Sequence, residues 1–127
     1  MVYTAEEKSR MDYLFTTFGD YIRSNKEFDI VYSEKLGYLS LVINRKHGII
    51  EDASPMKNFD ALLKELFFQI SNDVLALKMV GYHDDIELFP EEIKEVRRRA
   101  EPILNTMTQD REYGLAKLDY YLEHVND

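Results

Sequence analysis

A chain of 127 residues with no cysteine and a net charge of −8 excludes several classes of function. It has no disulfide, thiolate metal site or cysteine nucleophile. General nucleic-acid binding is disfavoured, because it depends on basic side chains that neutralise phosphates. With 45% hydrophobic residues the chain can build its own core, so we expect a single domain over residues 1–127.

The N-terminus and the longest apolar runs predict where the protein works. MVYTAEEKSR has no apolar signal core. No apolar run approaches the ~20 residues that a membrane helix needs. We therefore expect a cytoplasmic protein with no membrane partner, and the lack of cysteine agrees with a reducing compartment.

Residues 5–24 predict the first helix. Thr4 and Glu7 have the spacing of a capping box. Apolar residues then recur at helical spacing, at Met11, Leu14, Phe15, Phe18 and Ile22. Gly19 lies within this pattern and weakens it.

The periodicity then changes from helical to alternating. Residues 28–33 and 38–44 each alternate, and the connection between them contains Gly37, so they predict an antiparallel β-hairpin. Residues 49–51 predict a short third strand. A lone hairpin is marginal in water, so its apolar face is expected to pack on the helices. Its edges are possible places for a partner to add a strand.

Residues 58–78 predict a central helix that begins at Ser54–Pro55 or at Asn58. Its main apolar face is broad, and a second apolar line runs through Phe68, Leu75 and Met79. A helix with two apolar faces lies between two layers. The second layer is either another helix of this chain or a second subunit, and we weigh the buried helix and the homodimer interface about equally.

Two more helices are predicted after the central one. Pro90 begins the first of them, and Pro102 within it is expected to kink or break it. The last helix covers residues 109–125. We therefore expect an α+β fold in which an N-terminal helix and an antiparallel hairpin, with a possible third strand, precede three helices packed on one face of the small sheet.

The segment between the central helix and the helix that begins at Pro90 has the highest density of metal-binding residue types in the sequence. It contains His83, Asp84, Asp85 and Glu87. Carboxylates and imidazole bind divalent cations, but this spacing matches no known ligand signature. The more ordinary interpretation is a solvated turn whose acids favour the next helix N-terminus. We expect no cofactor and assign no catalytic residue.

Arg97, Arg98 and Arg99 form the main basic cluster. On a helix three consecutive residues fan over about 200°, so they cannot all meet one anion. We expect Arg97 and Arg99 to flank the apolar face and Arg98 to be solvated. Ion pairs with acids at helical spacing are favoured over an anion-binding role. The acids at that spacing are Glu91, Glu92, Glu95 and Glu101.

The last helix carries a line of residues typical of interfaces. Tyr113, Lys117, Tyr120 and His124 are predicted to lie opposite the leucine face. Tyrosine is enriched in binding surfaces because it offers apolar area with a polar tip. For any single tyrosine, half-exposure without a partner is the ordinary outcome.

Three functions compete on these observations. The favoured one is a small acidic, non-catalytic interaction or regulatory domain that binds a protein partner or associates with itself as a homodimer. The second is a metal-binding protein or small enzyme centred on His83–Glu87. The third is an acidic mimic that blocks a nucleic-acid-binding protein, which is weakened because 16 basic residues are interleaved with the 24 acids.

Overall fold

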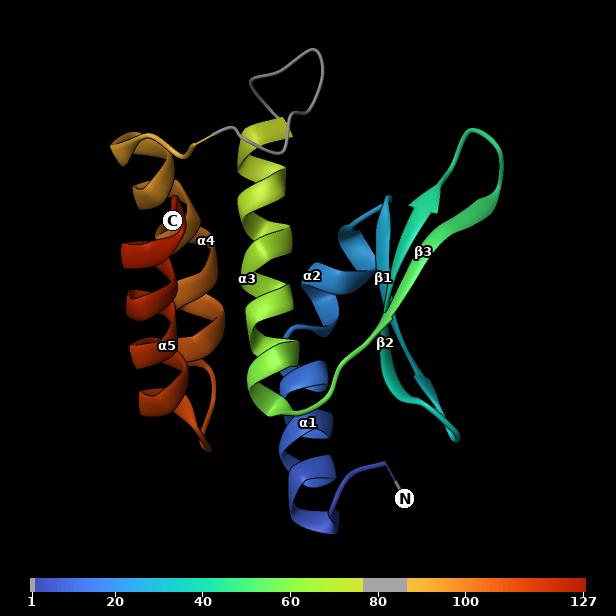
Figure 1. Cartoon of the computed structure of the whole chain (residues 1–127). Coiled ribbons are helices and arrows are strands. Elements are labelled where there is room, and N and C mark those ends of the chain that lie inside the picture. Colours follow the sequence, from blue (N-terminus) through green and yellow to red (C-terminus); the bar gives the residue numbers. More distant parts are fainter. Residues whose placement is uncertain (1, 77–86) are drawn as a thin grey trace. The chain divides into compact units, whose positions relative to one another are not determined.

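The computed structural model describes residues 2–76 and 87–127 and confirms the α+β fold (Figure 1). The helices are α1 (Ala5–Thr17), α2 (Gly19–Ser24), α3 (Phe59–Ala76), α4 (Pro90–Asn105) and α5 (Arg111–His124). The strands are β1 (Phe28–Ser33), β2 (Gly37–Asn44) and β3 (Ile49–Pro55). The chain divides into two compact units, Met1–Glu65 and Leu66–Asp127, and each is described by itself.

The predicted first helix is divided in two at Phe18. Thr4 caps α1, since its hydroxyl accepts the Glu7 N–H at 3.1 Å. Phe18 has φ −88° and ψ 7°, which ends α1, and Gly19 begins α2. The prediction of a single helix over residues 5–24 was therefore wrong. A glycine at the junction lowers helix propensity, and the side chains of Phe18 and Ile22 on either side of it are both buried.

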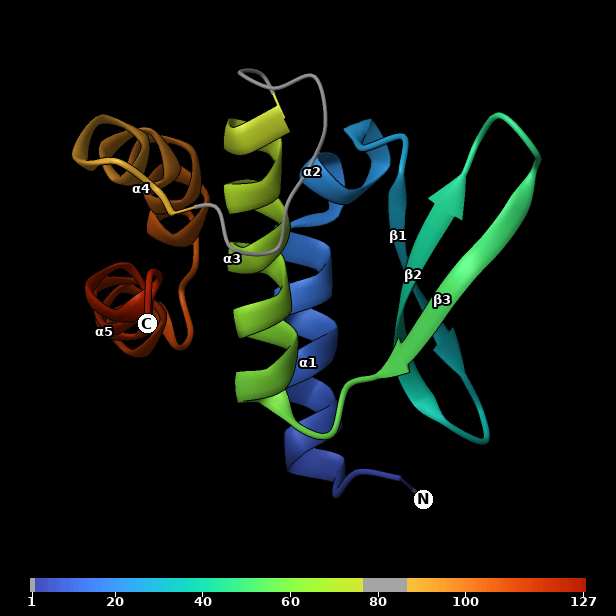
Figure 2. The same ribbon diagram turned by 45° about the horizontal axis from the view of Figure 1, so that its top comes forward.

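The three strands form an antiparallel sheet with β2 in the middle (Figure 2). The predicted hairpin is confirmed. The third strand is longer than predicted, because it continues from Ile49 to Pro55. Ser54 and Pro55, weighed as a helix start, thus belong to β3.

One face of the sheet lies against α1 and α2, and we call it the helix side. Phe28 and Ile30 are buried there, and the Phe28 ring packs at a tilt beside Tyr21 of α2, with ring centroids 6.2 Å apart. Tyr38 packs on Phe15 of α1 at 5.3 Å. The prediction that an apolar face of the hairpin packs on helices is confirmed for these elements.

The hydroxyl of Tyr3 links the ends of β2 and β3. It accepts the Tyr38 N–H at 2.9 Å and donates to the Met56 carbonyl. Gly37 lies directly against this tyrosine, and a Cβ there would come within 2.8 Å of a Tyr3 ring carbon. Gly37 also has φ +78°, a conformation that side chains disfavour. Glycine is therefore required at this position on two grounds.

Residues from α1 hold the start of α3. Asn58 accepts the Ala61 N–H at 2.9 Å, so Asn58 is the helix cap. Glu7 of α1 accepts the Phe59 N–H, and the Arg10 guanidinium lies 4.2 Å from the centroid of the Phe59 ring. Glu7 thus binds the next helix rather than closing the predicted capping box within its own.

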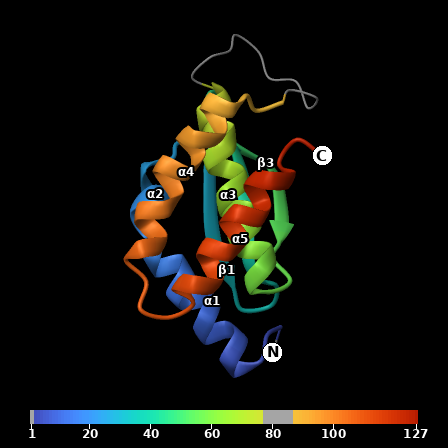
Figure 3. The ribbon, with the colours of Figure 1, turned by 90° about the vertical axis from the view of Figure 1, so that its left-hand side faces the viewer.

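In the second unit α4 and α5 form an antiparallel pair of helices (Figure 3). The buried faces contain Val96, Ala100, Leu104, Leu118 and Leu122. Helix α4 runs through Pro102 without ending there, so of the two expected outcomes, a kink or a break, the break does not occur. No helix in the described ranges combines the length and apolar character that crossing a membrane requires.

Candidate functional site

The candidate site is the exposed side of α5. Asp110 precedes the helix in a left-handed conformation with φ 58°. Gly114 lets α5 come close to α4, because a Cβ there would lie 3.0 Å from a methyl carbon of Leu104. Leu118 and Leu122 continue this buried side of the helix. Packing on α4 therefore fixes which side of α5 faces solvent.

Four side chains predicted as an interaction surface occupy that outer side, and we call them the α5 stripe. They are Tyr113, Lys117, Tyr120 and His124. Tyr113 is 38% exposed and Tyr120 62% exposed, whereas Lys117 is half-buried. A monomer that leaves two tyrosines this open on one helix face has apolar area available to a partner.

Contacts along the helix join the stripe into two pairs. The Lys117 ammonium lies 5.3 Å from the centroid of the Tyr113 ring. The rings of Tyr120 and His124 have centroids 4.4 Å apart, and His124 Nδ1 lies 2.7 Å from an Asp127 oxygen. Each pair is one helical turn apart, which is the spacing at which helix side chains meet. The stripe therefore combines aromatic area with one cation and one imidazole.

Tyr121 was not foreseen from the sequence, yet it anchors α5. Its hydroxyl is 3.2 Å from the Ser71 hydroxyl, and its ring lies 5.8 Å from that of Phe67, both on α3. Ser71 is buried and also donates to the Phe67 carbonyl at 2.9 Å. Helical spacing places Tyr121 beside the leucine face, but it does not specify a partner on another helix.

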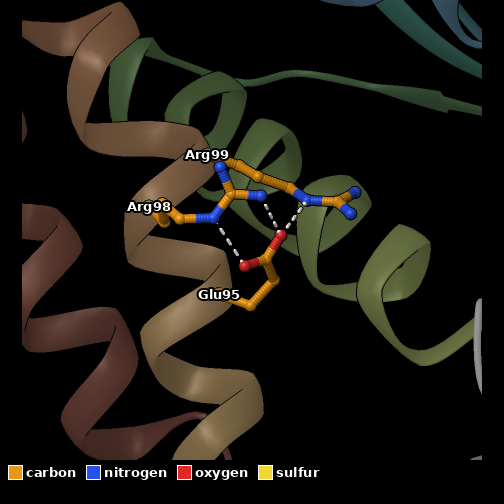
Figure 4. A network of polar contacts seen from close by, with 3 residues as sticks. All are labelled: Glu95, Arg98 and Arg99. Atoms are coloured by element: carbon orange, nitrogen blue, oxygen red, sulfur yellow. Dashed lines mark hydrogen bonds and ion pairs between the residues drawn. The ribbon is translucent and has the colours of Figure 1, made fainter.

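The arginine cluster of α4 is engaged in ion pairs (Figure 4). Arg98 Nε lies 2.7 Å from Glu95, and Arg99 Nε lies 2.9 Å from the same carboxylate. Hydrogen bonds from both guanidinium groups lower the pKa of Glu95 to about 2. The favoured interpretation of this cluster as helical ion pairs is confirmed for Arg98 and Arg99.

Arg97 points instead toward α5. It forms an ion pair with Asp119 as well as with Glu101, whose oxygen is 3.6 Å away. The hydrogen bond from Arg97 to Asp119 raises the pKa of the guanidinium. Asp119 was not among the predicted partners, because a pair between two helices has no signature in sequence spacing. It adds a polar link between α4 and the helix that carries the stripe.

The residues of the second apolar line on the central helix differ in their exposure to solvent. Phe68 is 42% exposed, whereas Leu75 is only 7% exposed. Met79 lies outside the described residues. Of this predicted surface, therefore, Phe68 is the residue that the structure places in contact with solvent.

The predicted metal loop is described at one position only. His83, Asp84 and Asp85 lie outside the described residues, and Glu87 is exposed. Within residues 2–76 and 87–127, no group of three histidine or acidic side chains is arranged to hold a metal ion.

Comparisons with known proteins give no relative from which to assign a function. No family model matches the chain, and neither the curated proteins nor the solved structures include a match. The geometry of the chain's own residues therefore carries the functional argument.

Proposed function

We propose that this protein is a small acidic interaction domain that acts without catalysis by binding a protein partner through the α5 stripe. The observation that carries the proposal is the pair of exposed tyrosines on one face of α5, with Tyr120 exposed by 62%. Tyrosine supplies large contact area and a hydroxyl, while it loses few rotamers on binding.

The way α5 is held supports the same proposal. Arg97 pairs with Asp119, and Asn126 binds the backbone of Leu88 through both of its amide atoms, at 2.7 and 2.9 Å. A surface on a fixed helix reduces the conformational entropy lost on association. The α5 stripe is therefore preorganised for a partner.

Self-association belongs to the same proposal, with Phe68 as the residue that contributes to a homodimer contact. An exposed phenylalanine on a helix offers apolar area without a compensating charge. We also place the protein in the cytoplasm, in line with its acidic, cysteine-free composition.

Affinity purification from the native host, followed by quantitative mass spectrometry, tests the proposal. The baits are wild type, the double variant Tyr113→Ala/Tyr120→Ala, and the matched control Glu112→Ala/Glu123→Ala on other exposed positions of α5. We expect one partner to bind wild type and the control, and to be reduced on the order of tenfold or more with the tyrosine variant. Equal recovery by all three baits would reject the α5 stripe as the interface.

A further inference from the structure

The sheet has an apolar face on the side opposite the helix side, and we call it the outer face. The register places seven apolar side chains there: Val31, Leu39, Leu41, Ile43, Ile50, Ala53 and Pro55. Ile50 is 59% exposed, and Ala53 and Pro55 are exposed as well. The apolar surface is therefore most open along β3, at one border of the sheet.

The two borders of the sheet differ in how their backbone groups are satisfied. Ile43 N–H donates to the Glu27 carbonyl, so alternation along the ladder turns the Ile30 N–H toward the free edge of β1. There the Asp29 carboxylate accepts it at 2.8 Å. At the centre of the β1 edge, the outward N–H group is thus already hydrogen-bonded to a side chain of β1 itself.

The β3 edge has no such closure among the described contacts. Met56 N–H donates to the Tyr38 carbonyl at 2.9 Å, so the same alternation directs the N–H and C=O of Ala53 away from β2. Ala53 is exposed. An edge strand with outward N–H and C=O groups is a template for a further strand.

Side chains along β3 determine which charges and apolar side chains that further strand needs. Asp52 lies opposite Val42 on the helix side and is exposed, and the exposed Glu51 accepts from the Asn44 amide at 2.7 Å. Ile50 and Ala53 lie on the outer face. The edge is therefore acidic on one face and apolar on the other.

A second copy of this chain fits the edge poorly. Antiparallel pairing of β3 with itself would gather Glu51 and Asp52 of both copies along one short edge, and a register centred on Asp52 would set this acid directly opposite itself. Like charges across strands destabilise pairing. Packing of two outer faces is also small. Three strands of about seven residues cover on the order of 400 Å², below the ~800 Å² that each partner of a stable complex buries.

We propose that β3 binds an extended segment of a partner protein in which apolar residues alternate with lysine or arginine. The segment adds a fourth strand beside β3, with its backbone paired to Ala53. Its apolar side chains extend the outer face beside Ile50 and Ala53, and its basic side chains face Glu51 and Asp52. Main-chain pairing gives the affinity, and this alternation gives the specificity. The site is independent of the α5 stripe.

Fluorescence anisotropy with a labelled peptide of alternating valine and lysine, titrated with the full chain, measures this binding. Glu51→Lys/Asp52→Lys is expected to weaken it on the order of tenfold, or about 1.4 kcal/mol. The matched control Glu6→Lys/Asp20→Lys changes the net charge equally on exposed positions of α1 and α2, and is expected to weaken it about twofold or less. Circular dichroism verifies that both variants are folded.

Ala53→Pro tests the strand pairing without any change in charge. Proline removes the outward N–H and is tolerated in edge strands, so it is expected to abolish the amide shifts that the peptide induces along β3 in NMR spectra. A peptide of the same composition with its lysines in one block is expected to bind more weakly.

Three results would overturn the proposal. They are equal binding of the block peptide, equal loss with the Glu6→Lys/Asp20→Lys control, and a dimer of the wild type that Glu51→Lys/Asp52→Lys abolishes in sedimentation. The last result would assign the β3 edge to a second copy. None of them bears on the partner of α5, so the α5 stripe and the β3 site fail separately. The dimer result would also move the homodimer contact from Phe68 to β3.

Discussion

At the scale of single residues, a small polar cluster joins α1 to the sheet. The Tyr38 hydroxyl donates to Asp12 at 2.6 Å, and Lys8 approaches the other oxygen of Asp12 at 2.8 Å. Partial burial acts to raise the pKa of Asp12, but the hydrogen bonds from Lys8 and Tyr38 outweigh it and leave the pKa lowered. Burial, followed by the hydrogen bond to Asp12 and then the Asp12 charge, raises the pKa of Tyr38 well above its ordinary value.

Tyr38→Phe is expected to change how stability depends on alkaline pH. The folded pKa of Tyr38 is raised, so its contribution is fully present below the unfolded pKa of about 10 and is lost as pH rises above it, by up to about 1.4 kcal/mol per unit. Urea unfolding between pH 8 and 12 should therefore show a shallower decline for Tyr38→Phe than for wild type. Tyr120→Phe, at an exposed position, should follow wild type; parallel curves for all three would contradict the assignment.

Two glycines with positive φ provide a matched comparison. Gly37→Ala meets both the strained backbone and the Tyr3 ring, whereas Gly48→Ala at φ +64° has nothing within 4 Å of its Cβ. We expect Gly48→Ala to lower the free energy of unfolding by about 1 kcal/mol and Gly37→Ala by about 2–4 kcal/mol. Urea denaturation measures both, and equal losses would show that Tyr3 yields to the added methyl group.

At the scale of elements, the pair α4–α5 is closed at one end by Asn126. Its Oδ1 accepts the Leu88 N–H and its Nδ2 donates to the Leu88 carbonyl. The side chain of Glu92 accepts the next backbone N–H, that of Phe89, at 2.9 Å. The backbone groups just before α4 are therefore paired with side chains from both helices. These bonds tie the start of one helix to the end of the other.

Asn126→Ala should therefore destabilise the protein by about 1–2 kcal/mol, since two backbone groups of Leu88 lose their partner. Asn126→Asp keeps the acceptor for the N–H and loses the donor, so an intermediate loss is expected. Hydrogen exchange of the Leu88 amide, together with chemical denaturation, checks both changes. Unaltered protection of the Leu88 amide in Asn126→Ala would mean that the two hydrogen bonds from Asn126 do not stabilise the start of α4.

At the scale of the whole molecule, substitutions at Phe68 and Leu75 distinguish an effect on folding from an effect on assembly. Phe68→Glu changes an exposed side chain and should leave the circular dichroism spectrum intact, while it abolishes the homodimer that we propose. Leu75→Glu introduces a charge at a buried position and should unfold the chain. Sedimentation velocity and thermal unfolding distinguish the two. Unfolding by Phe68→Glu would place Phe68 in the core and remove the dimer contact.

Local patterns in the sequence were enough to predict most of the elements. The hairpin, the start of α4 at Pro90 and the outward direction of Arg98 follow from backbone periodicity, from the fixed φ of proline and from the positive φ that glycine permits. The same rules predicted too short a third strand, at residues 49–51, and a single helix over residues 5–24 that the structure divides at Phe18. Strand pairing with β2 extends β3 through Ser54 and Pro55, and both are equally compatible with a helix start in isolation.

Which apolar and tyrosine side chains are exposed was decided only by the tertiary structure. Phe68 and Leu75 belong to one apolar line of the same predicted helix, yet 42% of the first and 7% of the second is accessible. Likewise Tyr120 and Tyr121 are neighbours, and only Tyr121 meets Ser71 and Phe67. The sequence by itself determined the order and type of most elements, because periodicity is a property of one segment. Which apolar and tyrosine side chains stay open to a partner depended on packing between segments far apart in the chain.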